Sequence, residues 1–152
     1  MRFSVAAVSA ALFGAALAAP APQADAGATE TVVIQKFVST SKGATTGSPV
    51  VSISFQLVSH REAGVKAYVC EAHNPNGITP ADVNQCAGFQ SFDGYHFQYL
   101  DTKTGNTSLR VFHQTAPAFG LWGNAFIPGN CGIEGDAQIC RKDSINVSLA
   151  LN

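Results

Sequence analysis

Apolar and polar residues alternate with a period of two along much of this chain. In segment 51–57 every second residue is apolar and the others are Ser or Gln, and segment 145–151 repeats the pattern. A strand with one face in a core and the other in water produces this alternation. At 65–69 the pattern places Val65, Ala67 and Val69 on the inner face. Further strands are expected where similar patterns or continuous apolar runs occur, at 31–38, 95–99, 109–111 and 122–127.

Turn-forming residues separate these predicted strands. Gly, Pro, Asn or Asp occur in segments 41–49, 61–64 and 101–106, as an antiparallel meander requires. Only segment 79–85 suggests a short helical turn, capped by its Thr and started by its Pro. Strands without a long helix predict a sandwich or a barrel, and barrel closure leaves no exposed strand edge. We therefore expect an all-β fold, a single small antiparallel β-barrel over residues 31–152.

The first 18 residues have the composition of a secretion signal. A short positive start at 1–2 precedes an uncharged Ala-rich apolar run at 3–17, and residues 16–18 form a small-residue cleavage pattern. The run is too short to span a bilayer. We expect a signal peptide at 1–18, a flexible tail at 19–30 rich in Ala, Pro and Gly, and a secreted, extracellular mature protein.

Four cysteines, Cys70, Cys86, Cys131 and Cys140, follow this signal. An even count in a secreted chain predicts two disulfides, for which three connectivities exist. Spacing favours the local pairs Cys70–Cys86 and Cys131–Cys140, because the segments between these partners are full of turn residues that need tethering. A crosslink around a loop of this size stabilises the fold by about 3 kcal/mol, mostly by restricting the unfolded chain.

A metal site is the alternative use of these cysteines. Cys70 and His73 have Cys-x-x-His spacing, and His96 and Cys131 could complete a four-ligand set. No second ligand pair at metal-site spacing follows, and an oxidising compartment favours disulfides. We therefore expect no metal, and no motif predicts another cofactor.

The charge of the chain is close to neutral. Cleavage of the signal removes Arg2, so nine Lys and Arg become eight against ten Asp and Glu, and the basic residues are scattered. A nucleic-acid or anionic-membrane partner would require a basic cluster. We therefore expect neither partner.

The order of these features resembles the Alternaria major allergen family of small secreted fungal proteins. The resemblance rests on the strand that ends at Cys70, the loop to Cys86, an apolar strand ending in Ile-Pro-Gly-Asn-Cys131, and a glycine-rich loop to Cys140 before a final alternating strand. It covers essentially the whole mature chain and implies an antiparallel β-barrel with the two disulfides favoured above. It also implies a non-enzymatic allergen-like effector or elicitor that binds plant defence proteins, thaumatin-like proteins included.

The predicted tail departs from the family pattern. The covalent dimer of the family uses a cysteine before the first strand, and residues 19–30 contain none. We therefore expect no covalent dimer through the N-terminal tail.

Two functions from other classes compete with this interpretation. Glu71, His73, Arg110 and His113 are the best acid–base set in the chain and could serve a secreted hydrolase of ribonuclease type. Their spacing fits no catalytic template, so we assign no catalytic residues and interpret them as solvated loop groups and one barrel-end histidine. The aromatic residues that crowd the second half could alternatively line a cavity for a small hydrophobic ligand, but they more simply fill a small barrel.

Two sequons make Asn106 and Asn146 glycosylation candidates. Asn106 falls in a predicted turn, whereas Asn146 falls on the polar face of a predicted strand. Asn106 is therefore the better candidate.

Overall fold

The computed structural model of this protein describes residues 28–45, 47–60, 64–88, 93–100 and 106–151. The predicted signal peptide at 1–18 lies outside the described residues, as does the predicted tail at 19–30 up to residue 27. Both therefore stay predictions.

The described residues form nine strands and no helix, which confirms the all-β prediction. The strands are β1 (Thr29–Lys42), β2 (Val50–Ser59), β3 (Lys66–His73), β4 (Val83–Gln85), β5 (Gly94–Leu100), β6 (Thr107–Ala116), β7 (Phe119–Ile127), β8 (Asn130–Glu134) and β9 (Ala137–Ala150). None of the described segments could cross a bilayer as a helix. The short turn expected at 79–85 is present only at its start, where the Asp82 N–H donates to the Thr79 carbonyl at 3.0 Å and the Ala81 N–H donates to the Thr79 hydroxyl at 3.3 Å. It does not continue as a helix, because residues 83–85 form β4.

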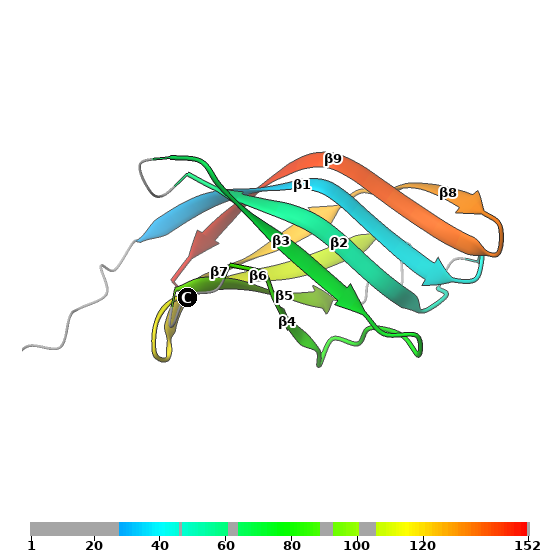
Figure 1. Cartoon of the computed structure of the whole chain (residues 1–152), viewed down its shortest axis with the longest axis horizontal. Helices are drawn as coiled ribbons and strands as arrows, with labels where there is room; N and C mark the ends of the chain where they lie inside the picture. The colour runs from blue at the N-terminus through cyan, green and yellow to red at the C-terminus, as the bar shows by residue number, and fades with distance from the viewer. Residues whose placement is uncertain (1–27, 46, 61–63, 89–92, 101–105, 152) are drawn as a thin grey trace, which may run out of the picture.

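Neighbouring strands are antiparallel and follow the order β3-β2-β1-β9-β7-β6-β5-β4, with β8 pairing only with β9. Figure 1 shows β3, β2, β1 and β9 above β7, β6, β5 and β4, as two halves of one strongly curved sheet. The two edges meet at the Cys70–Cys86 disulfide, beside which the Ala87 N–H donates to the Val69 carbonyl at 2.7 Å. The edge strands are therefore joined, and the sheet forms a nearly closed barrel.

A bulge in β1 explains how one strand of 14 residues follows this curvature. Its pairing with β2 shifts between Gln35 and Val38, and Lys36 between them has a positive φ of 52°. Two residues of β1 therefore oppose one of β2, which bends the strand and increases its twist. The bulge also resets the alternation, so that Ile34 and Phe37 both point inward.

The core lies between the two halves of the barrel. Phe37, Phe55 and Phe97 fill its middle, with the rings of Phe55 and Phe97 edge to face at 4.9 Å. Val147 and Leu149 are buried and Ser148 is exposed, so the faces predicted for the final strand are confirmed. A carrier function would therefore have to use the ends of the barrel.

The predicted faces of the third strand are wrong. Val65 and Val69 are 69% and 45% exposed, while Tyr68 and Cys70 point inward. The disulfide determines this orientation, because Cys70 must face Cys86 across the closing edge of the barrel. Weak alternation among small apolar residues did not indicate which face is buried.

Both disulfides predicted from the spacing are confirmed. Cys70 pairs with Cys86, and Cys131 pairs with Cys140 across the β8–β9 hairpin. Cys70 and Cys131 therefore cannot supply the thiolates that the alternative metal site would need.

Because all four cysteines are paired within the chain, we expect the mature protein to migrate at monomer mass on a non-reducing denaturing gel. Freshly secreted protein with and without a reductant provides the measurement. A dimer band that the reductant removes would contradict the internal pairing.

Candidate functional site

Five polar residues meet at the end of the barrel where β1 begins. Glu30 is the second residue of β1, Ser59 the last of β2, Tyr95 the second of β5, and His113 lies near the end of β6. Asp93 precedes β5. Because the strands are antiparallel, strand starts and strand ends alternate around one rim and bring these distant positions together. We call Glu30, Ser59, Asp93, Tyr95 and His113 the acid–base cluster.

Glu30 is the centre of this cluster and is 8% exposed. Its Oε1 accepts hydrogen bonds from the Ser59 hydroxyl at 2.8 Å and from the Tyr95 hydroxyl. Its Oε2 lies 2.5 Å from Nδ1 of His113, whose Nε2 lies 2.7 Å from Oδ1 of Asp93. The Tyr95 ring stacks on the His113 ring with centroids 4.2 Å apart. One imidazole is thus held between a buried and an exposed carboxylate.

The hydrogen bonds shift the pKa values of the cluster toward a charged pair. Burial opposes ionisation of Glu30, but hydrogen bonds from His113, Tyr95 and Ser59 outweigh it and lower the pKa. Burial likewise opposes a charge on His113, but its bonds to Glu30 and Asp93 raise the pKa above its usual value. Burial and the Glu30 carboxylate raise the pKa of Tyr95, which stays a neutral donor. The shifts therefore favour a charged pair of the His113 imidazolium and the Glu30 carboxylate.

The hydrogen-bond partners of the His113 ring nitrogens limit the chemistry that the cluster can perform. A histidine acts as a general base through a free lone pair on one ring nitrogen. Both nitrogens of His113 face carboxylates, and the Ser59 hydroxyl donates to Glu30. His113 is therefore not arranged as a general base. The hydrogen bonds of the cluster instead connect β1, β2, β5 and β6.

The free energy of unfolding should depend on pH through the acid–base cluster. The raised pKa of His113 means that its stabilisation is complete below its unfolded pKa near 6.5 and is lost as the pH rises through the folded value. The lowered pKa of Glu30 means that its stabilisation is complete above its unfolded pKa near 4.5 and is lost as the pH falls through the folded value.

We therefore expect the cluster to contribute most between about pH 4.5 and 6.5. Denaturant unfolding of the wild type and of His113→Asn across this window measures the effect. In His113→Asn, the free energy of unfolding should no longer fall as the pH rises above this window. Parallel pH profiles for the two proteins would contradict the assigned charge pair.

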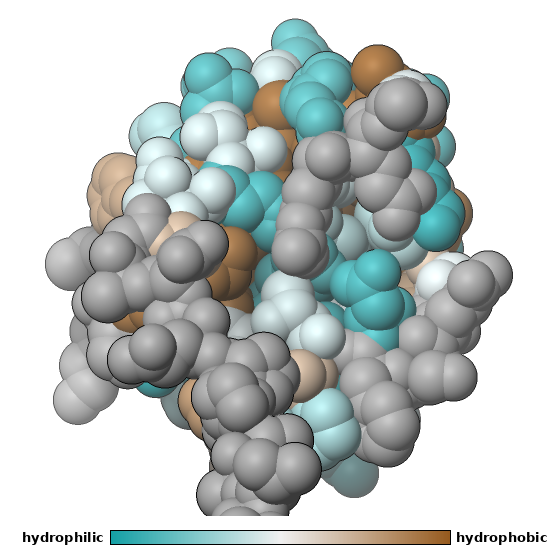
Figure 2. Space-filling view, turned by 90° about the vertical axis from the view of Figure 1, so that its left-hand side faces the viewer, coloured by the Kyte–Doolittle hydropathy of each residue, from teal (hydrophilic) through white to brown (hydrophobic). Residues whose placement is uncertain are grey.

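A small hollow of about 290 Å³ adjoins the cluster at this end. Besides Ser59, Asp93, Tyr95 and His113, its lining includes Lys66, Tyr68 and Thr115. Figure 2 looks at this end of the molecule, where hydrophilic residues occupy much of the described surface between apolar ones.

The four residues considered as a catalytic set do not come together. Glu71 and His73 are exposed on β3. Arg110 points outward from β6, where its guanidinium lies 4.7 Å from the Trp122 ring centroid and donates to Asn124 at 3.1 Å. His113 alone points inward, as the sequence predicted.

Sequence reasoning missed the partners of His113. Glu30 was assigned to the flexible tail, but β1 begins at Thr29, and Glu30 is buried. A signal for its role was present, because Glu30 continues the inward alternation of Val32 and Ile34 just as His113 continues that of Val111. Two titratable residues at inward positions of different strands were candidates for a buried pair.

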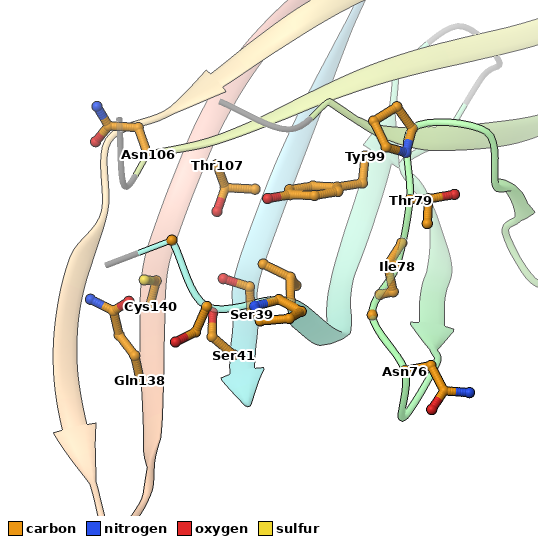
Figure 3. Close-up of a pocket in the computed structure, with 16 residues that line it drawn as sticks. Ser39, Ser41, Asn76, Ile78, Thr79, Tyr99, Asn106, Thr107, Gln138 and Cys140 are labelled. Carbon is orange, nitrogen blue, oxygen red and sulfur yellow. The ribbon is translucent and has the colours of Figure 1, made fainter. Parts of the chain in front are cut away.

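A larger hollow lies at the opposite end of the barrel, where β1 and β5 end and β6 and β9 begin (Figure 3). Its volume is about 480 Å³. Ser39, Ser41 and Thr107 are buried in its lining, and the hydroxyl end of Tyr99 points toward Thr107 (Figure 3). We call it the polar hollow.

Asn106 lies at the edge of this hollow, half-buried and just before β6. Asn146 is exposed on the outer face of β9. Both stay glycosylation candidates.

The outer face of β4, β5, β6 and β7 carries a group of apolar and aromatic side chains around a hollow of about 420 Å³. We call this group the outer aromatic patch; its members are Val83, His96, Phe112, Phe119 and Trp122. Val83 and Phe119 are 59% and 58% exposed. Partial burial lowers the pKa of His96, so its imidazole is neutral at neutral pH. Monomeric proteins rarely expose such groups without an interaction to cover them.

The fold and its crosslinks define the class of protein as a small, disulfide-closed antiparallel β-barrel. The family model of Alternaria alternata allergen 1 matches residues 34–141, more than half of the chain. The chain belongs to this allergen family, which confirms the resemblance found in the sequence.

A solved structure shows the same fold. The crystal structure of Alternaria alternata allergen Alt a 1 matches with a TM-score of 0.58 and 15% sequence identity, covering 80% of this chain and 88% of the other. No curated protein matches the sequence. Glu30 lies before the residues that the family model covers, whereas His113 lies within them.

Proposed function

We propose that this protein is a secreted, non-enzymatic effector or elicitor that acts by binding plant defence proteins, thaumatin-like proteins among them. The outer aromatic patch is the observation that carries this proposal. Aromatic and Arg side chains dominate the binding energy of protein interfaces, and here Phe119 and Trp122 lie on the same face of the sheet and Arg110 lies over the Trp122 ring. Membership of an allergen family is consistent with a protein that other proteins recognise.

The acid–base cluster supports a role without catalysis. Its imidazole and its buried carboxylate already have close hydrogen-bond partners on their polar atoms. Chemistry at this site would first have to break contacts that connect four strands. Binding through the outer surface requires no such rearrangement.

The two disulfides favour extracellular function, because such bonds persist in oxidising compartments. Together with the predicted signal peptide they support secretion. N-terminal sequencing of protein recovered from the culture medium tests both, and a chain retained inside the cell with its leader intact would contradict them.

A direct binding measurement tests the proposed interface. The mature protein is immobilised and titrated with a purified thaumatin-like protein, using the wild type, a Val83→Ser/Phe119→Ser double variant and Ile133→Ser. Ile133 is 65% exposed on β8 and does not line the outer aromatic patch, so it is a matched control for loss of an exposed apolar side chain.

We expect the double variant to bind at least about tenfold more weakly, since truncating interface anchors typically costs more than 1 kcal/mol each. Ile133→Ser should bind as the wild type does. Equal binding by all three proteins would contradict the outer aromatic patch as the interface. Absence of wild-type binding would exclude this class of partner.

A further inference from the structure

The polar hollow exists because small hydroxyl residues occupy inward positions of the barrel. Along β1 the inward positions after Glu30 are the large apolar residues Val32, Ile34 and Phe37, and the last two are Ser39 and Ser41. Along β6 they begin with Thr107, before larger residues follow. Large apolar side chains fill the middle of the barrel. The small polar side chains at its end fill less space and leave about 480 Å³ open.

The lining of the polar hollow is neutral and rich in groups that both donate and accept hydrogen bonds. No Asp, Glu, Lys, Arg or His is among the described residues that line it. Ser39, Ser41 and Thr107, which are 3%, 8% and 6% exposed, contribute hydroxyls, and Gln138 contributes an amide. Asn76 also lines the hollow, but its amide points away from it in Figure 3. Tyr99 places its ring and hydroxyl beside Thr107 (Figure 3).

This lining disfavours charged and apolar ligands. Among the described lining residues, a phosphate or a carboxylate would find no cation to pair with and a cation would find no carboxylate, so either would be desolvated without compensation there. An apolar ligand would cover buried hydroxyls and amides without replacing their bonds to water, which costs about 1–3 kcal/mol for each unpaired group. A ligand whose surface carries neutral hydroxyls avoids both the desolvation of an unpaired charge and the loss of hydrogen bonds by the lining groups.

We propose that the polar hollow binds a neutral saccharide of one or two rings. Hydroxyls and amides of the lining exchange hydrogen bonds with sugar hydroxyls, and Tyr99 packs against a ring. The volume lies within the usual range of small-molecule sites. Two sources could supply the sugar, namely a free saccharide or the glycan of the chain itself at Asn106, which lies at the edge of the hollow.

The test uses the full disulfide-bonded mature protein in an Asn106→Gln background, which cannot carry that glycan. Glucose, N-acetylglucosamine and their disaccharides are titrated while backbone amide shifts are followed by NMR. Glucose 6-phosphate is the matched charged probe. Glycosylated protein with the native Asn106 is measured in parallel.

Two variants remove or block the site. Thr107→Val keeps the side-chain shape and deletes one hydroxyl, and Ser39→Leu fills the floor of the hollow. Thr115→Val is the same chemical change in the hollow beside the acid–base cluster and serves as the control. Thermal unfolding confirms that each variant is folded.

We expect at least one neutral sugar to shift the amides of residues 39–41, 76–79 and 107 in a saturable way, and glucose 6-phosphate to do so less. Thr107→Val should weaken binding several-fold, in line with the loss of one hydrogen bond, and Thr115→Val should not. If the glycan of the chain occupies the hollow, the glycosylated protein will show the same shifts without added sugar. Absence of saturable shifts in both arms, or shifts that Ser39→Leu leaves intact, would overturn the proposal.

Discussion

The Glu30→Leu variant is expected to lose about 3–5 kcal/mol of unfolding free energy, the usual cost of removing one partner from a buried ion pair. Glu30 accepts hydrogen bonds from Ser59 and Tyr95 and faces His113, and all four residues lie on different strands. A leucine would leave a buried hydroxyl, a phenol and an imidazolium without this partner. Chemical denaturation at mildly acidic pH measures the change.

Asp93→Asn is the control for this experiment. Asp93 also contacts the His113 ring, but its side chain is 61% exposed. Exposed ion pairs contribute about 0–1 kcal/mol, so this variant should remain close to the wild type. Equal stability of Glu30→Leu and the wild type would mean that the cluster does not hold the barrel end together.

The second large effect is expected in the final strand. Val147 is 2% exposed and points into the core, whereas the adjacent Ser148 is exposed. Val147→Asp places a carboxylate among apolar side chains and should cost several kcal/mol or prevent folding, while Ser148→Asp should cost little. Melting temperatures of the two variants provide the measurement. Similar values would show that β9 does not bury the face assigned here.

The sequence predicted those features of the fold that depend on local pattern. Strong alternation at Val147 and Leu149 identified a strand and its inner face correctly. Turn-rich segments between nearby cysteines identified both disulfides, because short loops limit which pairs can form. These features depend only on residues that are close together in the sequence.

Features that depend on distant strands could not be predicted in this way. Two inner-face valines expected in β3 are exposed, because the Cys70 crosslink and the packing of Tyr68 on Tyr95 at 4.8 Å decide which face points inward. The acid–base cluster depends on Glu30 and His113, which are 83 positions apart and meet only once the barrel has formed. An isolated Glu before an apolar run resembles the end of a solvated tail.

The polar hollow illustrates the same limit. Ser39 follows a predicted strand and Ser41 begins a predicted turn, so neither was expected to face inward. The bulge at Lys36 shifts the alternation of β1, and pairing with β9 continues the strand to Lys42, so that both hydroxyls lie inside. A bulge depends on how two strands pair and leaves little trace in a single sequence.

A leaf-response assay tests most directly whether the protein acts through its outer surface. Wild type, the Val83→Ser/Phe119→Ser variant and His113→Asn, each shown to be folded and disulfide-bonded, are infiltrated at equal concentration and ion leakage is recorded. The Asn amide can still donate to Glu30 but cannot titrate, so this variant removes any acid–base chemistry. We expect His113→Asn to elicit the wild-type response and the outer-patch variant to lose most of it. Loss of the response in folded His113→Asn, with full activity of the outer-patch variant, would contradict the account and favour a hydrolytic function.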